Sequence, residues 1–342
     1  VLGIRASYSV MPKLSIGASF VTDLNQLAGL PDSDGDDYPD YNDFHPDDVN
    51  KWDDQDEAEN EWEGFNEFLT DQGYDALPDS KFNDWFETSQ FYNSYNPEGT
   101  ESDPISGMAL DAAYALSEKI TLYSQIGFLL GEIDTSIVDR SIYTDDIKLG
   151  WGLVPIGARA KLGPVNLLAE YRIGSRRFIF NYWDQAYDLN RVIVVNSIQT
   201  RESQLYQYGK LNGVYARADM SVLNLFNLGV GYQNMTGEKW DETAGEYKAG
   251  ETNQTFLTTI GINPSLIPKV GKADAFYQQS NVPNPFDFTP TSSTIWGYNL
   301  GIEVSSGVML VYQARTTYVP DVDNDGKFVP VESIQIETQF IF

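Results

Sequence analysis

Hydrophobic and polar residues alternate along most of this chain, which is the pattern of β-strands with one apolar and one polar face. Every second residue from Leu2 to Val10 is apolar, whereas Arg5, Ser7 and Ser9 would lie on the opposite face. Similar segments recur to the end of the chain. The predicted strands cover residues 2–10, 14–20, 108–116, 120–130, 148–162, 165–180, 205–222, 225–232, 255–262, 273–279, 296–304, 308–317 and 332–342.

The connections between these strands alternate between tight turns and long polar segments. Met11-Pro12-Lys13 and Gly163-Pro164 are examples of the tight turns. The long segments cover residues 24–104, 133–146, 181–203, 235–252, 284–293 and 319–331. In an antiparallel meander, this alternation places all long connections at one end of the sheet.

A soluble sandwich or propeller would also show alternating strands. Soluble strands average about five or six residues, however, and many of the predicted strands are about ten or longer. Aromatic residues also gather near strand ends, as in the interfacial girdles of membrane barrels. These residues are Tyr143, Trp151, Phe178, Phe180, Tyr182, Trp183, Trp240, Phe276, Tyr277, Trp296 and Tyr318. Together the two features favour a barrel.

The last eleven residues, Glu332–Phe342, carry the most specific signal. Ile334, Ile336, Thr338 and Phe340 alternate with polar residues, and the strand closes on Phe342. An unpaired terminal strand of this kind would promote aggregation in a soluble protein, but not where it closes a barrel. The segment resembles the terminal strand of bacterial outer-membrane β-barrel proteins, which ends in Phe and is read by their insertion machinery.

The resemblance implies an all-β fold: one transmembrane, antiparallel, up-and-down barrel over residues 1–342. Long loops would be extracellular, the C-terminus periplasmic, and the outer surface in contact with outer-membrane lipid and lipopolysaccharide. About thirteen strands can be counted, and such barrels prefer an even number. We therefore expect about fourteen, with one strand either missed or upstream of Val1. The absence of a signal peptide suggests a processed or truncated chain.

The negative charge is concentrated in one connection, predicted to be a large acidic extracellular insertion over residues 24–104. The whole chain has a net charge of −28, and residues 25–104 hold 24 acidic residues against two lysines. A field of this sign excludes a nucleic-acid partner. The chain has no run of about 20 apolar residues, the length that a transmembrane helix requires. It also has no cysteine and therefore no disulfide framework.

Residues 321–332 have the spacing of a calcium loop. Asp321, Asp323 and Asp325 fall at positions 1, 3 and 5, Lys327 offers its carbonyl at position 7, and Glu332 stands at position 12. Gly326 at position 6 allows the sharp turn, so the segment resembles the loop of an EF-hand without its helices. The alternative is a solvated acidic turn.

A second acidic cluster follows the second predicted strand. Its aspartates are Asp32, Asp34, Asp36, Asp40 and Asp43. With Pro39 and Pro46 they are similar to thrombospondin type 3 calcium repeats, although Asp37 replaces the usual Gly. Hard oxygen ligands suit Ca²⁺ as the cofactor. The alternative is an extended acidic linker.

Aromatic residues punctuate the rest of the insertion, so it is not a disordered tail. Residues 57–69 can form a short amphipathic helix with Trp62 and Phe65 on one stripe. The aromatic residues either pack into a small folded cap over the barrel mouth or bind a surface protein or polysaccharide. The candidates for such contacts are Trp52, Trp62, Trp85, Tyr92 and Tyr95.

Alternation also assigns charged residues to the inside of the barrel. These residues could line an aqueous pore or pair across a narrow interior and block it. They are Arg5, Asp111, Arg159, Lys161, Glu170, Arg172, Arg176, Arg217, Asp219, Glu303, Arg315 and Glu337.

Signatures of catalysis are absent. The single histidine, His45, lies in the acidic cluster, and the chain has no cysteine nucleophile or phosphate-binding loop. We therefore predict that the protein is not an enzyme.

Two functional classes remain open. The first is transport, either a porin-like passage for small solutes or a carrier for apolar ones similar to the FadL family. The second is a structural barrel that anchors its insertion to a surface partner, as barrels of the type 9 secretion machinery do. Transport is preferred, and a homo-oligomer is compatible with either class.

Overall fold

The computed structural model is dominated by one antiparallel sheet of thirteen strands. It describes residues 1–30, 32, 35, 38–40, 43–92, 104–133, 147–184, 186–194, 198–241, 243–305, 307–320 and 327–340. The strands of the sheet are β1 (Leu2–Met11), β2 (Leu14–Asp23), β3 (Ile105–Ala115), β4 (Ile120–Leu130), β7 (Trp151–Leu162), β8 (Val165–Gly174), β11 (Tyr208–Val222), β12 (Phe226–Asp241), β13 (Glu246–Ile262), β14 (Val270–Val282), β15 (Thr294–Ser305), β16 (Val308–Pro320) and β17 (Phe328–Phe340).

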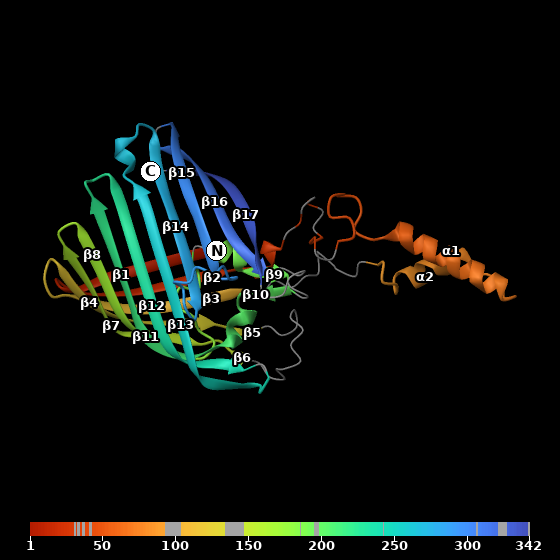
Figure 1. Cartoon of the computed structure of the whole chain (residues 1–342), viewed down its shortest axis with the longest axis horizontal. Helices are drawn as coiled ribbons and strands as arrows, with labels where there is room; N and C mark the ends of the chain where they lie inside the picture. Colours follow the sequence, from red (N-terminus) through yellow and green to blue (C-terminus); the bar gives the residue numbers. More distant parts are fainter. Residues whose placement is uncertain are drawn as a thin grey trace.

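Each strand pairs with its neighbours in the chain, so the sheet is an up-and-down meander (Figure 1). In the described part of the chain, β1 pairs only with β2 and β17 only with β16. The ladder of hydrogen bonds is therefore continuous from β1 to β17 but is not seen to close. The predicted number of about fourteen strands compares with thirteen observed.

Short turns lie at one end of the sheet and long connections at the other, as the alternation predicted. The predicted loop 235–252 is wrong in its extent, because β12 and β13 continue through most of it. Trp240 stands directly opposite Tyr247 there, with ring centroids 5.1 Å apart. Cross-strand aromatic pairs stabilise a hairpin, which explains the extension.

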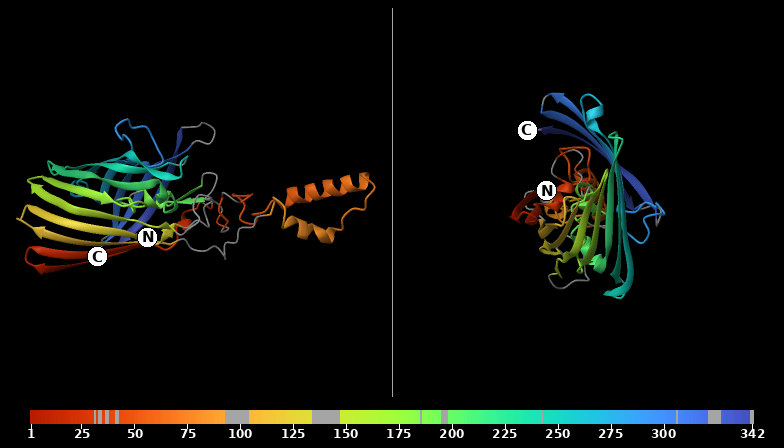
Figure 2. Two further views of the ribbon diagram at one scale, coloured as in Figure 1. Left: turned by 90° about the horizontal axis from the view of Figure 1, so that it is seen from below. Right: turned by 90° about the vertical axis from the view of Figure 1, so that its left-hand side faces the viewer.

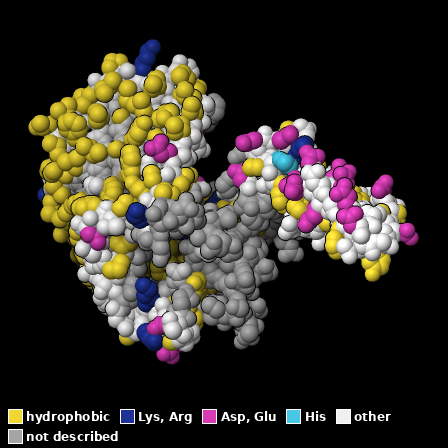
Figure 3. Space-filling view, turned by 45° about the vertical axis from the view of Figure 1, so that its right-hand side comes forward, with side chains coloured by type: hydrophobic (Ala, Val, Ile, Leu, Met, Phe, Trp, Pro, Cys, Tyr) yellow, Lys and Arg dark blue, Asp and Glu magenta, His cyan; other side chains and the backbone are white. Residues whose placement is uncertain are grey.

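The two faces of the sheet differ sharply. The convex face, called the outer face below, exposes large apolar side chains on twelve of the thirteen strands, β14 being the exception, with Ile4 (71% exposed) and Ile336 (63% exposed) as examples. Apolar side chains cover the part of this surface seen in Figure 3. The concave face, called the inner face, carries the polar and charged partners of the same alternation, and the connection after β8 folds against it (Figure 2). No second sheet larger than two strands exists in the described residues to cover the outer face.

The acidic insertion contains its own small helical unit. It comprises α1 (Gln55–Asp71), the 3-10 turn η2 (Asp79–Lys81) and α2 (Phe82–Phe86). Asp54 caps α1 by accepting a hydrogen bond from the backbone N–H of Glu57. Trp62 is buried against Phe82 and Trp85. The unit projects beyond the end of the sheet (Figures 1 and 2) and does not lie across its mouth as the predicted cap would.

Short elements complete the described part. They are β5 (Glu132–Ile133) and β6 (Ile147–Lys148), the hairpin β9 (Val192–Val194) and β10 (Ile198–Thr200), α3 (Tyr187–Asn190), and the 3-10 turns η1 (Gln26–Gly29), η3 (Ser203–Gln207) and η4 (Pro264–Leu266). None of the described helices is long and apolar enough to span a membrane.

We predict that Trp62→Ala unfolds the helical unit and leaves the sheet intact. Truncating a buried Trp typically costs about 3–5 kcal/mol, a large loss for a unit built from one helix of 17 residues and one of five. Limited proteolysis should cut residues 55–92 rapidly, while the β signal in circular dichroism is unchanged. Phe65→Ala is the matched control, because Phe65 is 47% exposed on the same helix. Equal protection of residues 55–92 from protease in both variants would contradict the packing described.

Candidate functional site

The inner face carries charged residues that neutralise one another. Arg5 on β1 reaches across β2 to Asp111 on β3, with 2.9 Å between Nη1 and Oδ2. The intervening residue is Gly17, and a Cβ there would collide with both side chains. Arg217 forms a second pair with Asp219 on β11, with 2.7 Å between Nη2 and Oδ1. These pairs place fixed charges of both signs on the concave surface.

The strand register places eleven of the predicted interior residues on this face. They are Arg5, Asp111, Arg159, Lys161, Glu170, Arg172, Arg217, Asp219, Glu303, Arg315 and Glu337. The twelfth, Arg176, follows the end of β8 and pairs with Glu238 on β12, with 2.8 Å between Nε and Oε2.

A buried ion pair forms the centre of the inner face. The Glu170 and Arg172 side chains are 8% and 6% exposed, and their Oε2 and Nη2 atoms are 2.6 Å apart. Tyr123 donates to Glu170, and Arg172 donates to Gln233. The guanidinium also lies over the ring of Tyr215, 3.9 Å from its centroid. Because both charges are hydrogen-bonded, the pair can persist away from bulk water.

The described parts of residues 175–207, called the inner loop below, fold back onto the inner face. Ile179, Tyr182, Tyr187 and Leu205 from this loop form a buried cluster with Ile105 of β3 and Leu129 of β4. The loop turns inward at Arg177 and Asn181, where the backbone φ is +59° at both residues. The predicted strand 165–180 is therefore too long, because β8 ends at Gly174.

Glycines on the strands make room for the aromatic rings of this loop. A Cβ at Gly107 would lie 2.5 Å from the ring of Trp183, and one at Gly152 would overlap the ring of Phe178. The assignment of Phe178, Tyr182 and Trp183 to an interfacial girdle is therefore wrong, since these residues pack inside. Trp151 and Trp296 are exposed on the outer face, as a girdle requires.

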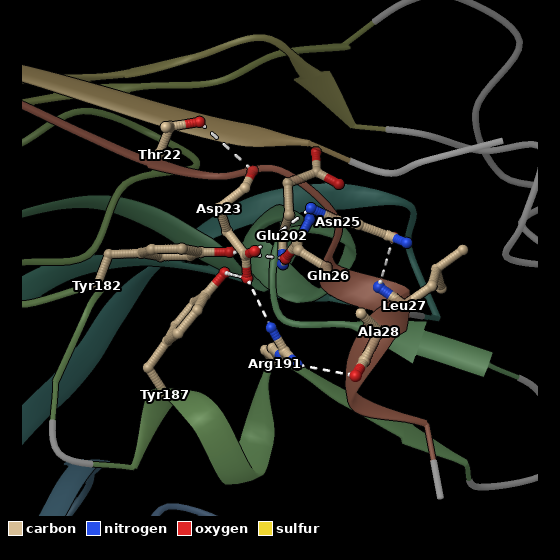
Figure 4. Close-up of polar contacts among 10 residues, drawn as sticks. All are labelled: Thr22, Asp23, Asn25, Gln26, Leu27, Ala28, Tyr182, Tyr187, Arg191 and Glu202. Atoms are coloured by element: carbon tan, nitrogen blue, oxygen red, sulfur yellow. Dashed lines mark hydrogen bonds and ion pairs between the residues drawn. The ribbon is translucent and has the colours of Figure 1, made fainter. Parts of the chain in front are cut away.

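A polar cluster fastens the inner loop to the end of β2, and Figure 4 shows its members. Tyr187 Oη donates to Asp23 Oδ2 at 2.9 Å, and Arg191 Nη1 lies 3.4 Å from the same oxygen. Arg191 Nη2 also donates to the carbonyl of Ala28 at 2.9 Å. We call Asp23, Tyr187 and Arg191 the latch.

Two further hydrogen bonds surround the latch. Gln26 Oε1 accepts from Tyr182 Oη at 3.2 Å and from the backbone N–H of Glu202 at 3.3 Å. Asp23, Gln26 and Tyr187 are each at most 3% exposed. Burial and the neighbouring Asp23 carboxylate raise the pKa of Tyr187 well above its usual value. Tyr187 therefore remains a neutral donor at ordinary pH.

The predicted calcium ligands fall only partly on described residues. Asp34, Asp36, Asp321, Asp323 and Asp325 lie outside them. Asp32 and Asp43 each accept a local backbone hydrogen bond, from Gly35 and His45, and Asp40 follows in a turn. Lys327 precedes β17, and Glu332 is exposed within that strand opposite Thr316. In the described part of the chain, no group of three or more acidic or histidine side chains could hold a metal ion.

Four of the five predicted contact residues pack against aromatic residues of the insertion. Trp52 stacks on Tyr38 with an interplanar angle of 4°, Trp62 is buried, and Tyr92 packs edge-on against Phe86. Trp85 packs against Trp62, and Tyr95 lies outside the described residues. The exposed aromatic residues of α1 are instead Phe65 and Phe68 (58% exposed).

Sequence reasoning missed the latch and the inner loop. Asp23 ends a predicted strand, whereas Tyr187 and Arg191 lie in a segment interpreted as an extracellular loop. The available signal was composition, since residues 178–194 are too rich in aromatic and aliphatic side chains for a loop in water.

No protein-family model matches this chain, and no curated protein matches it in sequence. Solved structures with a similar arrangement include CdiB from Acinetobacter baumannii, at 12% identity and a TM-score of 0.31 over 69% of this chain. A ferric enterobactin receptor from Pseudomonas aeruginosa matches 93% of this chain at 11% identity and a TM-score of 0.34. This chain spans 42% of the length of each of those proteins. Likeness at this level carries no functional argument.

We predict that Gly107→Leu displaces the inner loop, because the added side chain would occupy the position of the Trp183 ring. Trp183 should then become accessible, which acrylamide quenching of its fluorescence would detect. Gly261→Leu is the control, since a Cβ at Gly261 has no neighbour closer than 3.5 Å. An unchanged quenching constant in Gly107→Leu would contradict the packing described.

Proposed function

We propose that this protein is an outer-membrane β-barrel. The observation that carries the proposal is the exposed apolar outer face, to which twelve of the thirteen strands of the sheet contribute exposed large side chains. Water would disfavour so large an apolar surface, since patches on soluble monomers rarely exceed a few hundred Å². Hydrocarbon favours it, provided that the strands satisfy one another's backbone hydrogen bonds. Outer-membrane lipid and lipopolysaccharide would therefore cover this face, with the long connections on the cell exterior.

Within the barrel, we propose a passage for small solutes that the inner loop narrows. The charged inner face supports an aqueous interior, because paired charges would be costly in an apolar one. The inner loop occupies part of that interior through contacts with β3 and β4. The proposal assigns no catalytic role to any residue.

The latch is the part of this arrangement that can control the passage. It joins the inner loop to the strand end from which the acidic insertion departs. A movement of the insertion would therefore displace Asp23 directly. Loss of the latch would free the inner loop from the wall at one end and widen the passage.

We predict that Arg191→Ala raises single-channel conductance in planar bilayers. Loss of a hydrogen bond to a charged group costs about 1.5–3 kcal/mol, enough to shift an open-to-closed ratio by roughly 10- to 150-fold. The wild type should show small or infrequent steps, and the variant larger or longer ones.

Lys248→Ala is the matched control for that measurement. It removes one cation from an exposed ion pair with Asp241 at the tip of the β12–β13 hairpin. Its conductance should equal that of the wild type. Absence of any conductance in all three proteins would overturn the solute passage and leave a closed structural barrel.

A scaffold is the second candidate function, and one observation favours it. Phe65 and Phe68 are exposed on α1, surrounded by acidic residues, on a unit that projects away from the sheet. An exposed apolar patch of this kind is better suited to bind a partner protein at the cell surface than to close the mouth of the barrel. The two functions are compatible, because a partner on α1 could act on the latch through the insertion.

We also propose that Ca²⁺ binds the acidic segments 32–43 and 321–332, on the strength of their ligand spacing. A cation would relieve the repulsion among carboxylates and stabilise only the folded loops.

Chelation should make residues 24–104 more sensitive to protease and leave the sheet unchanged, and Asp34→Ala should reproduce the effect in the presence of calcium. Identical digestion with calcium and with chelator would contradict the proposal.

A further inference from the structure

A cavity lies between the inner loop and the inner face. Its volume is about 380 Å³, at the lower end of the range of small-molecule pockets. Strands β2, β3, β4, β7 and β8 form one wall, and residues 178–183 form the other. The strand wall is hollowed because it carries small residues such as Ala109 and Gly127. The loop wall is aromatic, with Phe178, Phe180, Tyr182 and Trp183.

The cavity offers no uncompensated charge. Among the described residues that line it, Glu170 and Arg172 are the only ionisable ones apart from the Tyr182 phenol. They are bonded to each other, to Tyr123 and to Gln233. A charged ligand would lose its hydration and gain no free counterion here. The ligand that fits this wall is therefore neutral.

Polar and apolar groups nevertheless converge on the same space. Ser19, Gln125 and Asn181 present hydroxyl and amide groups among the aromatic rings. The indole Nε1 of Trp183 is buried and makes no hydrogen bond within the described residues. That atom has almost no accessible surface, so a ligand would contact the Trp183 ring and not its N–H. The ligand should thus combine hydroxyl groups with an apolar face.

We propose that this cavity binds a small neutral polyhydroxylated solute, of the size of a mono- or disaccharide. The C–H face of a pyranose ring packs on aromatic rings, and its hydroxyl groups match Ser19, Gln125 and Asn181. The inference names the solute class for the proposed passage and rests on that function for its biological meaning. Binding itself requires only the cavity.

The test is calorimetric titration of the detergent-folded protein with glucose, galactose, xylose, maltose, cellobiose and sucrose, with gluconate as a charged probe. At least one neutral sugar should bind saturably with a Kd below about 10 mM, and gluconate should not. Failure of all six sugars, or binding of gluconate as tight as that of the best sugar, would overturn the proposal.

Two glycine variants locate the binding site. Gly127→Leu fills the cavity with little strain, since a Cβ there has no neighbour closer than 3.7 Å, and should weaken binding at least tenfold. Gly261→Leu adds the same side chain to β13, outside the cavity, and should bind as the wild type does. Equal affinity in wild type and Gly127→Leu would place the sugar elsewhere and overturn the assignment.

The outcome is separable from that of the proposed passage. Sugar binding without conductance would support a ligand site in this cavity and would contradict an open channel. Conductance without sugar binding would support the channel and overturn this inference alone.

Discussion

The structure depends on one constraint: a single continuous sheet must present an apolar surface outward and a polar surface inward. Alternation of side chains along a strand achieves this with a period of two, so a slip of one residue in any strand would reverse its faces. The pairing is antiparallel from β1 to β17. Eight of its twelve strand pairings contain a register shift, yet charged residues such as Arg5, Arg217 and Glu337 still lie on the inner face. Every other feature of the chain is arranged around these two surfaces.

The inner face shows how the remaining space is used. Glycines at positions 17, 107 and 152 remove side chains where a neighbouring strand or the inner loop needs the volume. Several of the charges that alternation forces inward form ion pairs, as Arg5 does with Asp111 and Arg172 with Glu170. The inner loop then brings a small hydrophobic core into an otherwise polar interior, and the latch fixes its position at β2.

Much of the sheet could be predicted from the sequence, because alternation over ten or more residues has few interpretations. The strands, the asymmetry of the turns and the inward charges such as Arg217 followed from periodicity alone. The inner loop could not be predicted in this way, because its direction depends on positive φ angles at Arg177 and Asn181 and on cavities left by distant glycines. The latch was equally inaccessible, since Asp23 and Arg191 are separated by more than 160 residues. The length of the β12–β13 hairpin was underestimated because its polar residues were interpreted as a loop. An aromatic pair, Trp240 and Tyr247, stabilises the strands there.

The central claim is that lipid covers the outer face while the inner loop lies inside. Fluorescence quenching by lipids with brominated acyl chains tests it most directly, in two reconstituted variants that each retain one of the seven tryptophans. Trp296 is on the outer face and 42% exposed, whereas Trp183 packs on Gly107 at the inner face. The account predicts strong quenching of Trp296 and weak quenching of Trp183. Equal quenching of the two, or protection of Trp296, would contradict it.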